Sequence, residues 1–214
     1  MSKVKVGFFS FTEITDPNEH HAYNEWHMLD HMPEQYPLDG IAYGQRWVST
    51  PACRAARAAS GERLDPIHYV TLYLMTDPVD RTLREFMELG KHLREVDRFH
   101  LHRRACLSGP FRFAAAAAAP RVLISSEAVP YRPNRGVYVQ VDPGSAPVDL
   151  DQLCARPGVA GAWTFADDER TITVSWLDDD PLVVAAHFPP PGGRTEFAGP
   201  FESITPWKWD WFDR

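Results

Sequence analysis

The stretch Tyr23-Asn-Glu-Trp-His-Met-Leu-Asp-His-Met-Pro-Glu34 has the spacing of an amphipathic helix. At that spacing Asn24, His27 and His31 fall on one stripe, because residues three and four apart share a helix face. Two imidazoles and an amide are groups that accept, donate and orient protons around a bound small molecule. The sequence therefore predicts that any chemistry is carried by this helix.

Helix-like and strand-like segments flank this helix in a regular order. Asp16 followed by Pro17 can cap the start of the helix, which continues to about Tyr36. Strands are expected over 3–11, 41–48 and 67–75, a helix over 77–96, a further strand within 99–113, and a mobile Ala/Arg-rich loop over 50–66. This β-α-β-β-α-β order is the ferredoxin-like arrangement, in which both helices cover one face of an antiparallel sheet.

The same order returns later in the chain in a shortened form. Ser108-Gly-Pro-Phe corresponds to Ala198-Gly-Pro-Phe, and Thr76-Asp-Pro to Asp179-Asp-Pro, in the same sequence order. This agreement favours an internal duplication. An alanine run at 114–119, followed by proline, resembles a linker. We therefore expect a first ferredoxin-like repeat with the candidate site at 1–113, a linker at 114–135 and a second, shortened repeat at 136–214.

The expected fold class is α+β, with two tandem ferredoxin-like (βαββαβ) repeats packed sheet on sheet as an α/β barrel within one chain. The helices of the second repeat are short, at about 148–155 and before Pro189-Pro-Pro-Gly-Gly, so we expect one functional pocket and one vestigial pocket. Near the C-terminus, Trp207, Trp209 and Trp211 alternate. This period predicts three indoles on one face, buried between the sheets or against another subunit.

The composition limits the class of partner. The chain has 214 residues, 44% of them hydrophobic, and a formal charge of -7, which argues against a nucleic acid or an anionic membrane as partner. Three cysteines without CxxC spacing, and no apolar leader or long apolar run, favour a reduced, cytoplasmic setting without a membrane span. A hydrophobic small molecule is the expected partner, and a homodimer is left open.

His31 is the candidate for general acid or base, with Asp30 and Asn24 as supporting residues. The alternative is a surface histidine or a core histidine with satisfied hydrogen bonds. His27 and Trp26 on the same helix are expected to contact the substrate. The spacing leaves open which stripe of the helix faces inward.

Two strands supply candidate pocket walls. Tyr43, Arg46 and Trp47 on one strand, and His68, Tyr69 and Tyr73 on the next, are expected on the face that lines the barrel interior. Core packing is the alternative for these side chains, and it is favoured for the tryptophan and for Tyr73. On an otherwise apolar strand, the arginine must pair with an acid, reach solvent, or bind an anionic or carbonyl oxygen.

No metal site is expected. His27 and His31 have the i, i+4 spacing of two metal ligands, but Glu25 and Met28 do not complete an HExxH pattern and the sequence shows no third ligand. His100 and His102, beside two arginines, are expected at the surface. Phosphate-binding loops and a GxSxG elbow are absent from the sequence. Haem binding stays an alternative, although no CxxCH motif is present.

The stretch from Tyr23 to Glu34, followed by a turn and the strand Gly40-Ile-Ala-Tyr-Gly-Gln-Arg-Trp, resembles the EthD-like branch of the dimeric α/β-barrel superfamily. The resemblance covers about residues 3–113, and it implies the barrel fold and a role for His31. The superfamily includes cofactor-free monooxygenases, polyketide cyclases and dehydratases, lactone isomerases and haem-binding barrels. This chain departs from a dimer of identical halves, because its second half has no counterpart of the histidine-bearing helix.

The sequence thus leads to the hypothesis of a cofactor-independent enzyme that acts on a hydrophobic aromatic or polyketide-like molecule by histidine-assisted proton transfer. Dehydration, cyclisation and oxygenation all fit this hypothesis, so it covers both a lyase and a monooxygenase. The alternatives are a non-catalytic module that binds a hydrophobic ligand, and a haem-binding barrel.

Overall fold

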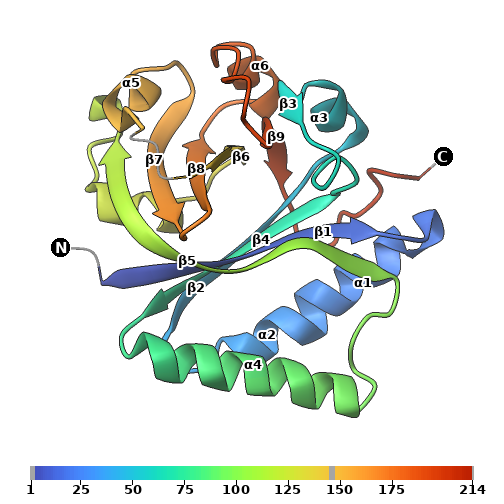
Figure 1. Ribbon diagram of the computed structural model, residues 1–214. Helices are drawn as coiled ribbons and strands as arrows, with labels where there is room; N and C mark the ends of the chain where they lie inside the picture. The colour runs from blue at the N-terminus through green and yellow to red at the C-terminus, as the bar shows by residue number, and fades with distance from the viewer. Residues whose placement is uncertain (1–2, 145–147, 214) are drawn as a thin grey trace.

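The computed structural model describes residues 3–144 and 148–213, in which one antiparallel sheet closes on itself and helices cover its outer face (Figure 1). Its strands are β1 (Val4–Ile14), β2 (Ile41–Val48), β3 (Ala59–Ser60), β4 (Tyr69–Thr76), β5 (Arg103–Ala118), β6 (Gly136–Pro143), β7 (Val159–Ala166), β8 (Arg170–Leu177) and β9 (Phe197–Ser203). The order is β2-β4-β1-β5-β7-β8-β6-β9, and β9 also pairs with β2 and with the short β3.

Each half of the sheet has the ferredoxin-like strand order. The first half is β2-β4-β1-β5 and the second is β7-β8-β6-β9, so the first strand of each repeat lies inside its sheet. The halves join edge to edge at β5–β7 and at β2–β9. The predicted fold class, a duplicated ferredoxin-like α/β barrel within one chain, is confirmed.

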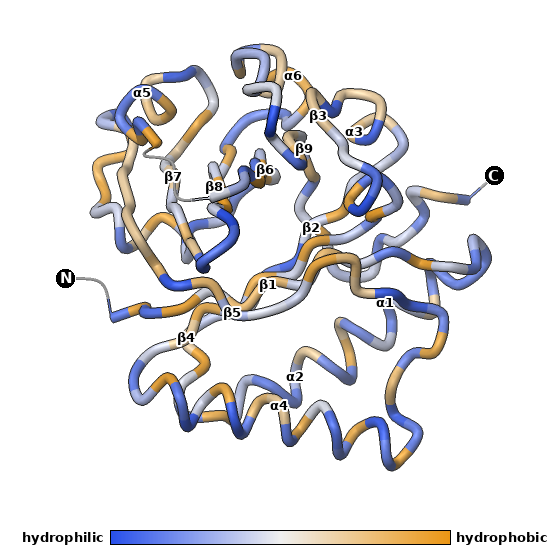
Figure 2. The backbone as a smooth tube through the Cα atoms, in the orientation of Figure 1, coloured by the Kyte–Doolittle hydropathy of each residue, from blue (hydrophilic) through white to orange (hydrophobic). Residues whose placement is uncertain are grey.

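The outer face of the first sheet carries two helical segments. The first consists of η1 (Pro17–Glu19), α1 (His20–Trp26), the π-helical turn η2 (His27–His31) and α2 (Met32–Gln35). The carboxylate of Asp16 accepts a hydrogen bond from the backbone N–H of Asn18 at 2.9 Å, as expected of the N-cap. The second is α4 (Val79–Glu95), which alternates between hydrophilic and hydrophobic positions (Figure 2). None of the helices in the described parts is long and apolar enough to cross a membrane.

The barrel interior is filled with buried aromatic and aliphatic side chains from both halves. Phe9, Trp47, Phe111, Trp163 and Trp176 are all at most 2% exposed and belong to one cluster. The interior is therefore a packed core, as in other small barrels.

The prediction that Arg46 and Trp47 both line the barrel interior is wrong. Neighbouring residues of a strand point to opposite faces, and Trp47 belongs to the interior cluster while Arg46 lies on the helix-covered side. Tyr73 also lies on the helix-covered side, packed with Phe86 of α4, and Tyr69 packs with Tyr23 of α1. These side chains meet the helices, so any pocket they form lies outside the barrel.

The second repeat has short helices, as expected: α5 (Leu150–Cys154) and α6 (Pro181–Ala185). The alanine run is different, because residues 114–118 continue β5, and residues 115–118 pair with β7 where the linker was expected to begin. Small side chains on both strands explain this: Ala118 lies opposite Gly161, and Val129 of η4 (Ser126–Tyr131) packs over that glycine. The connection between β5 and β6 contains η3 (Pro120–Val122) and η4.

Two further expectations are corrected. The 50–66 segment contains α3 (Pro51–Ala55) and β3, and Arg57 holds it by donating to the carbonyl oxygens of Asp65 and Ile67 at 2.6 and 2.7 Å. The C-terminal tryptophans are not buried together: Trp207 is 75% exposed, whereas Trp209 is 7% exposed. Trp207 has a φ of 68°, which ends the strand-like alternation on which the prediction depended.

Substitution of Gly136 by Ala is expected to destabilise the protein by about 3 kcal/mol, because a Cβ there would overlap the carbonyl oxygen of Phe201 on β9. Gly90→Ala in α4 is the matched control. A Cβ at Gly90 meets nothing within 4 Å, so this change is expected to stabilise the helix by about 0.5–1 kcal/mol. Urea unfolding of the two variants measures the difference, and equal free energies of unfolding would contradict the close approach of β6 and β9.

Candidate functional site

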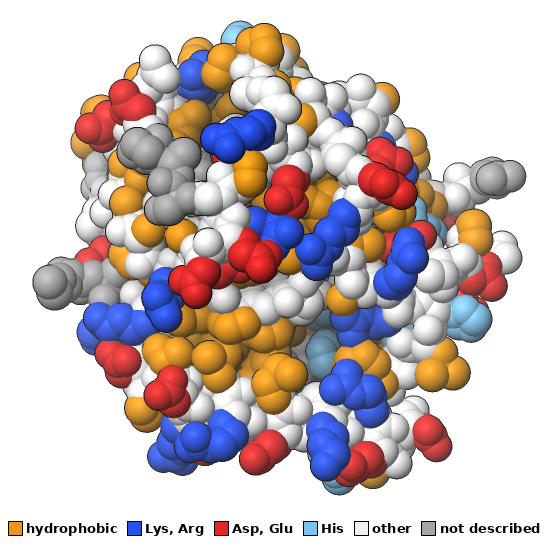
Figure 3. Space-filling view, in the orientation of Figure 1, with side chains coloured by type: hydrophobic (Ala, Val, Ile, Leu, Met, Phe, Trp, Pro, Cys, Tyr) orange, Lys and Arg blue, Asp and Glu red, His pale blue; other side chains and the backbone are white. Residues whose placement is uncertain are grey.

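A cavity of about 210 Å³ lies between the helical layer and the outer face of the first sheet. Figure 3 shows histidine atoms in the hollow between the two layers, with basic side chains around them. The lining comes from β1, η2, α2, β4, α4 and β5 and from the segment before β5: Phe8, Ser10, His27, His31, Gln35, Thr71, Tyr73, Phe86, Met87, Gly90, Arg94, Phe99, Arg103, Ala105 and Ser108. The cavity therefore combines aromatic walls with a small set of polar groups, as binding sites for small molecules do.

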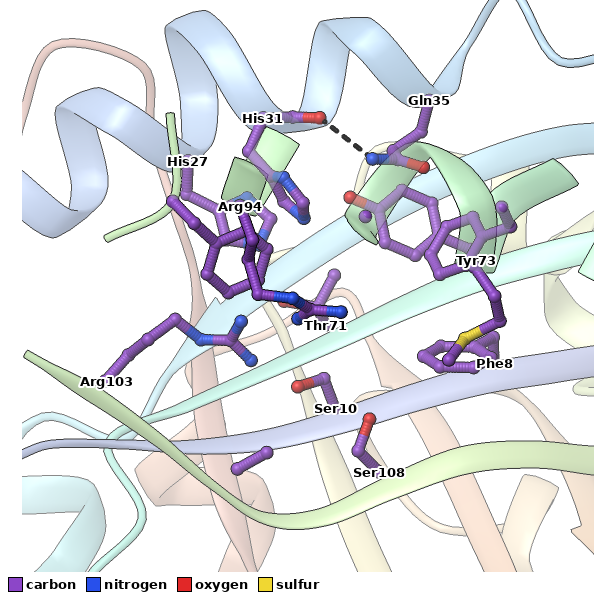
Figure 4. A pocket seen from close by; sticks show the side chains of 15 residues that line it. Phe8, Ser10, His27, His31, Gln35, Thr71, Tyr73, Arg94, Arg103 and Ser108 are labelled. Atoms are coloured by element: carbon purple, nitrogen blue, oxygen red, sulfur yellow. Dashed lines mark hydrogen bonds between the residues drawn. The ribbon is translucent and has the colours of Figure 1, made fainter. Parts of the chain in front are cut away.

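The two histidines lie on the π-helical turn η2. The centroids of the His27 and His31 rings are 5.1 Å apart, with an angle of 83° between the ring planes. π-Helical turns inside α-helices occur frequently at functional sites, because the wider turn changes the direction of the side chains on it. The turn brings both imidazoles to the cavity (Figure 4).

Aromatic rings fix the orientation of His31. The ring of Trp26 stacks on it at 4.6 Å between centroids, and Phe99 meets it edge-on at 5.4 Å. The indole of Trp26 is itself held, because its Nε1 donates to the backbone carbonyl of Arg98 at 2.9 Å. Trp26 thus positions the imidazole and does not line the cavity.

Several buried polar atoms around the cavity have no hydrogen-bond partner among the described residues. They are His27 Nδ1, His31 Nδ1, Gln35 Oε1, Thr71 Oγ1, Tyr73 OH and Arg103 Nε. Figure 4 shows these side chains around one space, with the single dashed line marking the bond from Gln35 Nε2 to the carbonyl of His31 at 3.3 Å. Buried polar atoms in native proteins are nearly always paired, so a concentration of unpaired ones around a cavity indicates a binding site.

The cavity keeps its histidines uncharged. Burial, followed by the charges of Arg103 and Arg46, lowers the pKa of His31 from 6.5 to about 3, while the nearby Asp30 opposes this shift. Burial is also the main cause that places the pKa of His27 well below 6.5, with Arg46 next. Burial raises the pKa of the Tyr73 hydroxyl above its usual value of 10. At neutral pH the site therefore offers two neutral imidazoles and a protonated phenol.

Asn24 and Arg46 lie behind the cavity and contact each other. Arg46 Nη2 donates to Asn24 Oδ1 at 3.1 Å, and its guanidinium lies 5.0 Å from the Tyr23 ring centroid. Asn24 Nδ2 in turn donates to the Tyr69 hydroxyl at 2.8 Å. The structure thus joins two predicted site residues into one buried network that does not line the cavity.

Asp30 lies on the outer side of η2. Its carboxylate accepts hydrogen bonds from Arg98, the shortest at 2.7 Å, and Arg98 also pairs with Glu34. Asp30 makes no contact with His31 that would orient the ring, and it acts on that imidazole through its charge.

Tyr43 and His68 are not brought to the cavity. Tyr43 packs against the barrel core and meets the Tyr131 ring at 5.3 Å, while His68 Nδ1 accepts the backbone N–H of Ile14 at 3.1 Å. Tyr43 faces the barrel interior, and His68 precedes β4 and lies beside His20 of α1.

The sequence did not single out Arg94, Arg103, Phe99 or Gln35 as site residues. Arg94 is on α4, and Arg103 and Phe99 are at and before the start of β5, more than sixty residues from the histidines. Gln35 is on the histidine stripe, one turn after His31. That stripe was the one signal that could have identified it.

The residues do not fit a haem or a metal cluster. Within residues 3–144 and 148–213, no group of three or more His, Cys, Asp or Glu side chains could hold a metal ion. The cavity volume is below the roughly 300–1,000 Å³ of sites for drug-sized ligands, and a tetrapyrrole is large among such ligands. The expectation that His100 lies at the surface is wrong: its side chain is only 10% exposed, and its Nε2 lies 3.3 Å from a carboxylate oxygen of Glu19.

A second cavity of about 160 Å³ occupies the corresponding place in the second repeat. Tyr138, Thr173, Ser175, Arg156 and Phe188 are among the residues that line it, and none of its described lining residues is a histidine. The side chains that line the two cavities therefore differ.

No known family profile matches the chain, and no similar curated protein was found. Two of the solved structures that resemble the chain are both distant from it. A mutant chlorite dismutase from Candidatus Nitrospira defluvii, in complex with cyanide, is 11% identical with a TM-score of 0.45, over 92% of this chain and 90% of that one. A proposed monooxygenase from Lactobacillus acidophilus NCFM is 8% identical with a TM-score of 0.40, over 93% of each chain. These likenesses are distant, so the reaction has to be argued from the cavity itself.

Proposed function

We propose that this protein is an enzyme that acts on a small aromatic or polyketide-like molecule by proton transfer through His31, without a bound cofactor. The observation that carries the proposal is the set of unpartnered buried polar atoms around an aromatic-lined cavity. A ligand that filled the cavity would satisfy these atoms, and Phe8, Tyr73, Phe86 and Phe99 would contact its rings.

Each polar group suits one part of this chemistry. The neutral imidazole of His31 can accept a proton from a substrate hydroxyl or from an activated carbon. The Tyr73 hydroxyl, whose pKa is raised by burial, stays protonated and can donate to a substrate oxygen that gains negative charge. His27 lies within the same ring cluster and can relay or hold the proton.

Asn24, Arg46 and Trp26 are proposed as positioning residues. Trp26 stacks on His31, and the Asn24–Arg46 pair fixes a positive charge behind both imidazoles. The proposed proton removal could begin a dehydration, a cyclisation or an oxygenation. The resemblance to the EthD-like branch supports this class of reactions, because cofactor-free monooxygenases and polyketide cyclases belong to that superfamily.

A non-catalytic binding module is the second candidate. One observation favours it: the low pKa of His31 makes its imidazole a weak base in the free protein. Incubation with a panel of phenolic and β-keto aromatic compounds, followed by mass spectrometry of the products, separates the two. The enzyme proposal predicts saturable product formation, whereas saturable binding without product would support the module and contradict the enzyme. A Soret band after reconstitution with haem would contradict both.

A further inference from the structure

We infer that the molecule bound in this cavity is an anion, with a carboxylate or a similar planar oxyanion held by Arg94 and Arg103. The inference rests on the proposed function for the location of the site, and it does not depend on catalysis. It adds the chemical class of the ligand and two residues that select it.

Arg94 and Arg103 flank a single aromatic ring. The guanidinium carbon of each lies 4.8 Å from the centroid of the Phe99 ring, although one arginine is on α4 and the other begins β5. Figure 4 shows both guanidinium groups extended into the cavity, below the side chains of His27 and His31 in this view. The arrangement places two planar hydrogen-bond donors at one end of a space whose walls are aromatic.

Neither guanidinium has an acidic partner among the described residues. Their neighbours in sequence do: Arg98 pairs with Asp30 and Glu34, and Arg104 pairs with Glu13 at 2.6 Å. The described lining of the cavity contains no Asp or Glu, and Arg103 Nε is buried without a hydrogen-bond partner. The buried Nε of Arg103 needs an acceptor, and the exposed Arg94 adds a second positive charge beside it, so a ligand carboxylate would complete the site.

The charges around His31 link this anion to the proposed proton transfer. Arg103 from β5, Arg46 from β2 and Arg94 from α4 all lower the pKa of His31, while Asp30 on its own turn raises it and His27 lies beside it. A bound carboxylate would offset the field of the arginines and raise the pKa of the imidazole. The site would then hold its strongest base when the anionic ligand is present.

Equilibrium binding of salicylate and of its neutral amide, salicylamide, tests the inference by calorimetry. The wild-type protein is expected to bind salicylate at least about tenfold more tightly. This preference is expected to fall to within about twofold in the Arg94→Gln/Arg103→Gln protein. The preference is expected to persist in Arg84→Gln, which removes an exposed arginine of the same helix.

Equal affinities in the wild type, a preference that survives in the double variant, or no binding of either compound at millimolar concentration would overturn the inference. The single Arg94→Gln variant, at an exposed position, keeps the test available if the double variant does not fold. The His31→Gln protein is expected to keep the preference for salicylate. This result would support anion recognition by the arginines even if the protein shows no turnover. The failure of one proposal is thus distinguishable from the failure of the other.

Discussion

Turnover by the His31→Gln protein is expected to fall by roughly 10²–10⁴-fold, the usual contribution of a positioned general acid or base. Glutamine has a similar size and can still form hydrogen bonds, but it cannot accept a proton at neutral pH. His31 is only partly buried, and its backbone carbonyl, which accepts from Gln35, is unchanged. The loss is therefore expected in kcat while the protein stays folded.

His92→Gln is the matched control, because it removes an exposed imidazole from α4 that does not line the cavity. Its kcat is expected to stay within about twofold of the wild-type value. The assay uses whichever compound of the aromatic panel is turned over, with circular dichroism to verify folding. An unchanged kcat in folded His31→Gln protein would refute the role of this residue in proton transfer.

The free energy of unfolding is expected to fall steeply as the pH drops below 6.5. Burial, as the largest cause, lowers the pKa of His20 to about 4, that of His31 and of His68 to about 3, and that of His27 well below 6.5. The unfolded chain therefore binds protons at these four residues before the folded chain does. Stability that is fully present above pH 6.5 is lost progressively as the pH falls toward the folded-state pKa values.

The expected slope is large. Each histidine that is protonated only in the unfolded state contributes about 1.4 kcal/mol per pH unit, so four contribute roughly 5 kcal/mol per unit near pH 5. Urea unfolding at several pH values measures the slope. His68→Gln is expected to lower the slope by about 1.4 kcal/mol per pH unit, the contribution of one histidine. His92→Gln, the control, is expected to leave the slope unchanged. A free energy of unfolding that stays flat between pH 7 and pH 5 would contradict the burial of these imidazoles.

Much of the fold could be predicted from local patterns. The strand at 41–48 matches β2 residue for residue, because its side chains alternate between the core and the helix layer. The landmarks of the duplication fall at equivalent places: the two Gly-Pro-Phe sequences lie in β5 and β9, the last strands of the repeats. Likewise, Asp77-Pro lies directly before α4, and the proline of Asp180-Pro is the first residue of α6.

The alanine run and the C-terminal tryptophans could not be predicted in the same way. Residues 115–118 pair with β7, a strand that lies more than forty residues later in the chain. Alanine by itself has no strand preference, so only this tertiary pairing selects the extended form. The position of each tryptophan depends instead on its own side-chain contacts. For example, the ring centroids of Trp209 and His21 are 5.2 Å apart.

For the candidate site, the histidine stripe was visible in the sequence but its surroundings were not. Helical spacing placed His27 and His31 on one side, and the π-helical turn then decided how both rings meet the cavity. The arginines that control their charge come from three other elements, β2, α4 and β5. Contacts between residues so far apart in the chain form only in the folded protein. The sequence therefore indicated Asp30, the neighbour of His31, as its supporting residue and gave no sign of Arg103.

The most direct test of the central claim is a titration of ¹⁵N-labelled histidine side chains by NMR, with and without salicylate. The claim is that neutral imidazoles on the π-helical turn face a ligand cavity on the helix-covered side of the sheet. It predicts that His27 and His31 show neutral imidazole signals from pH 8 down to pH 5, and that salicylate shifts these two signals most. Protonation of His31 near pH 6.5, or salicylate shifts confined to other histidines, would contradict it.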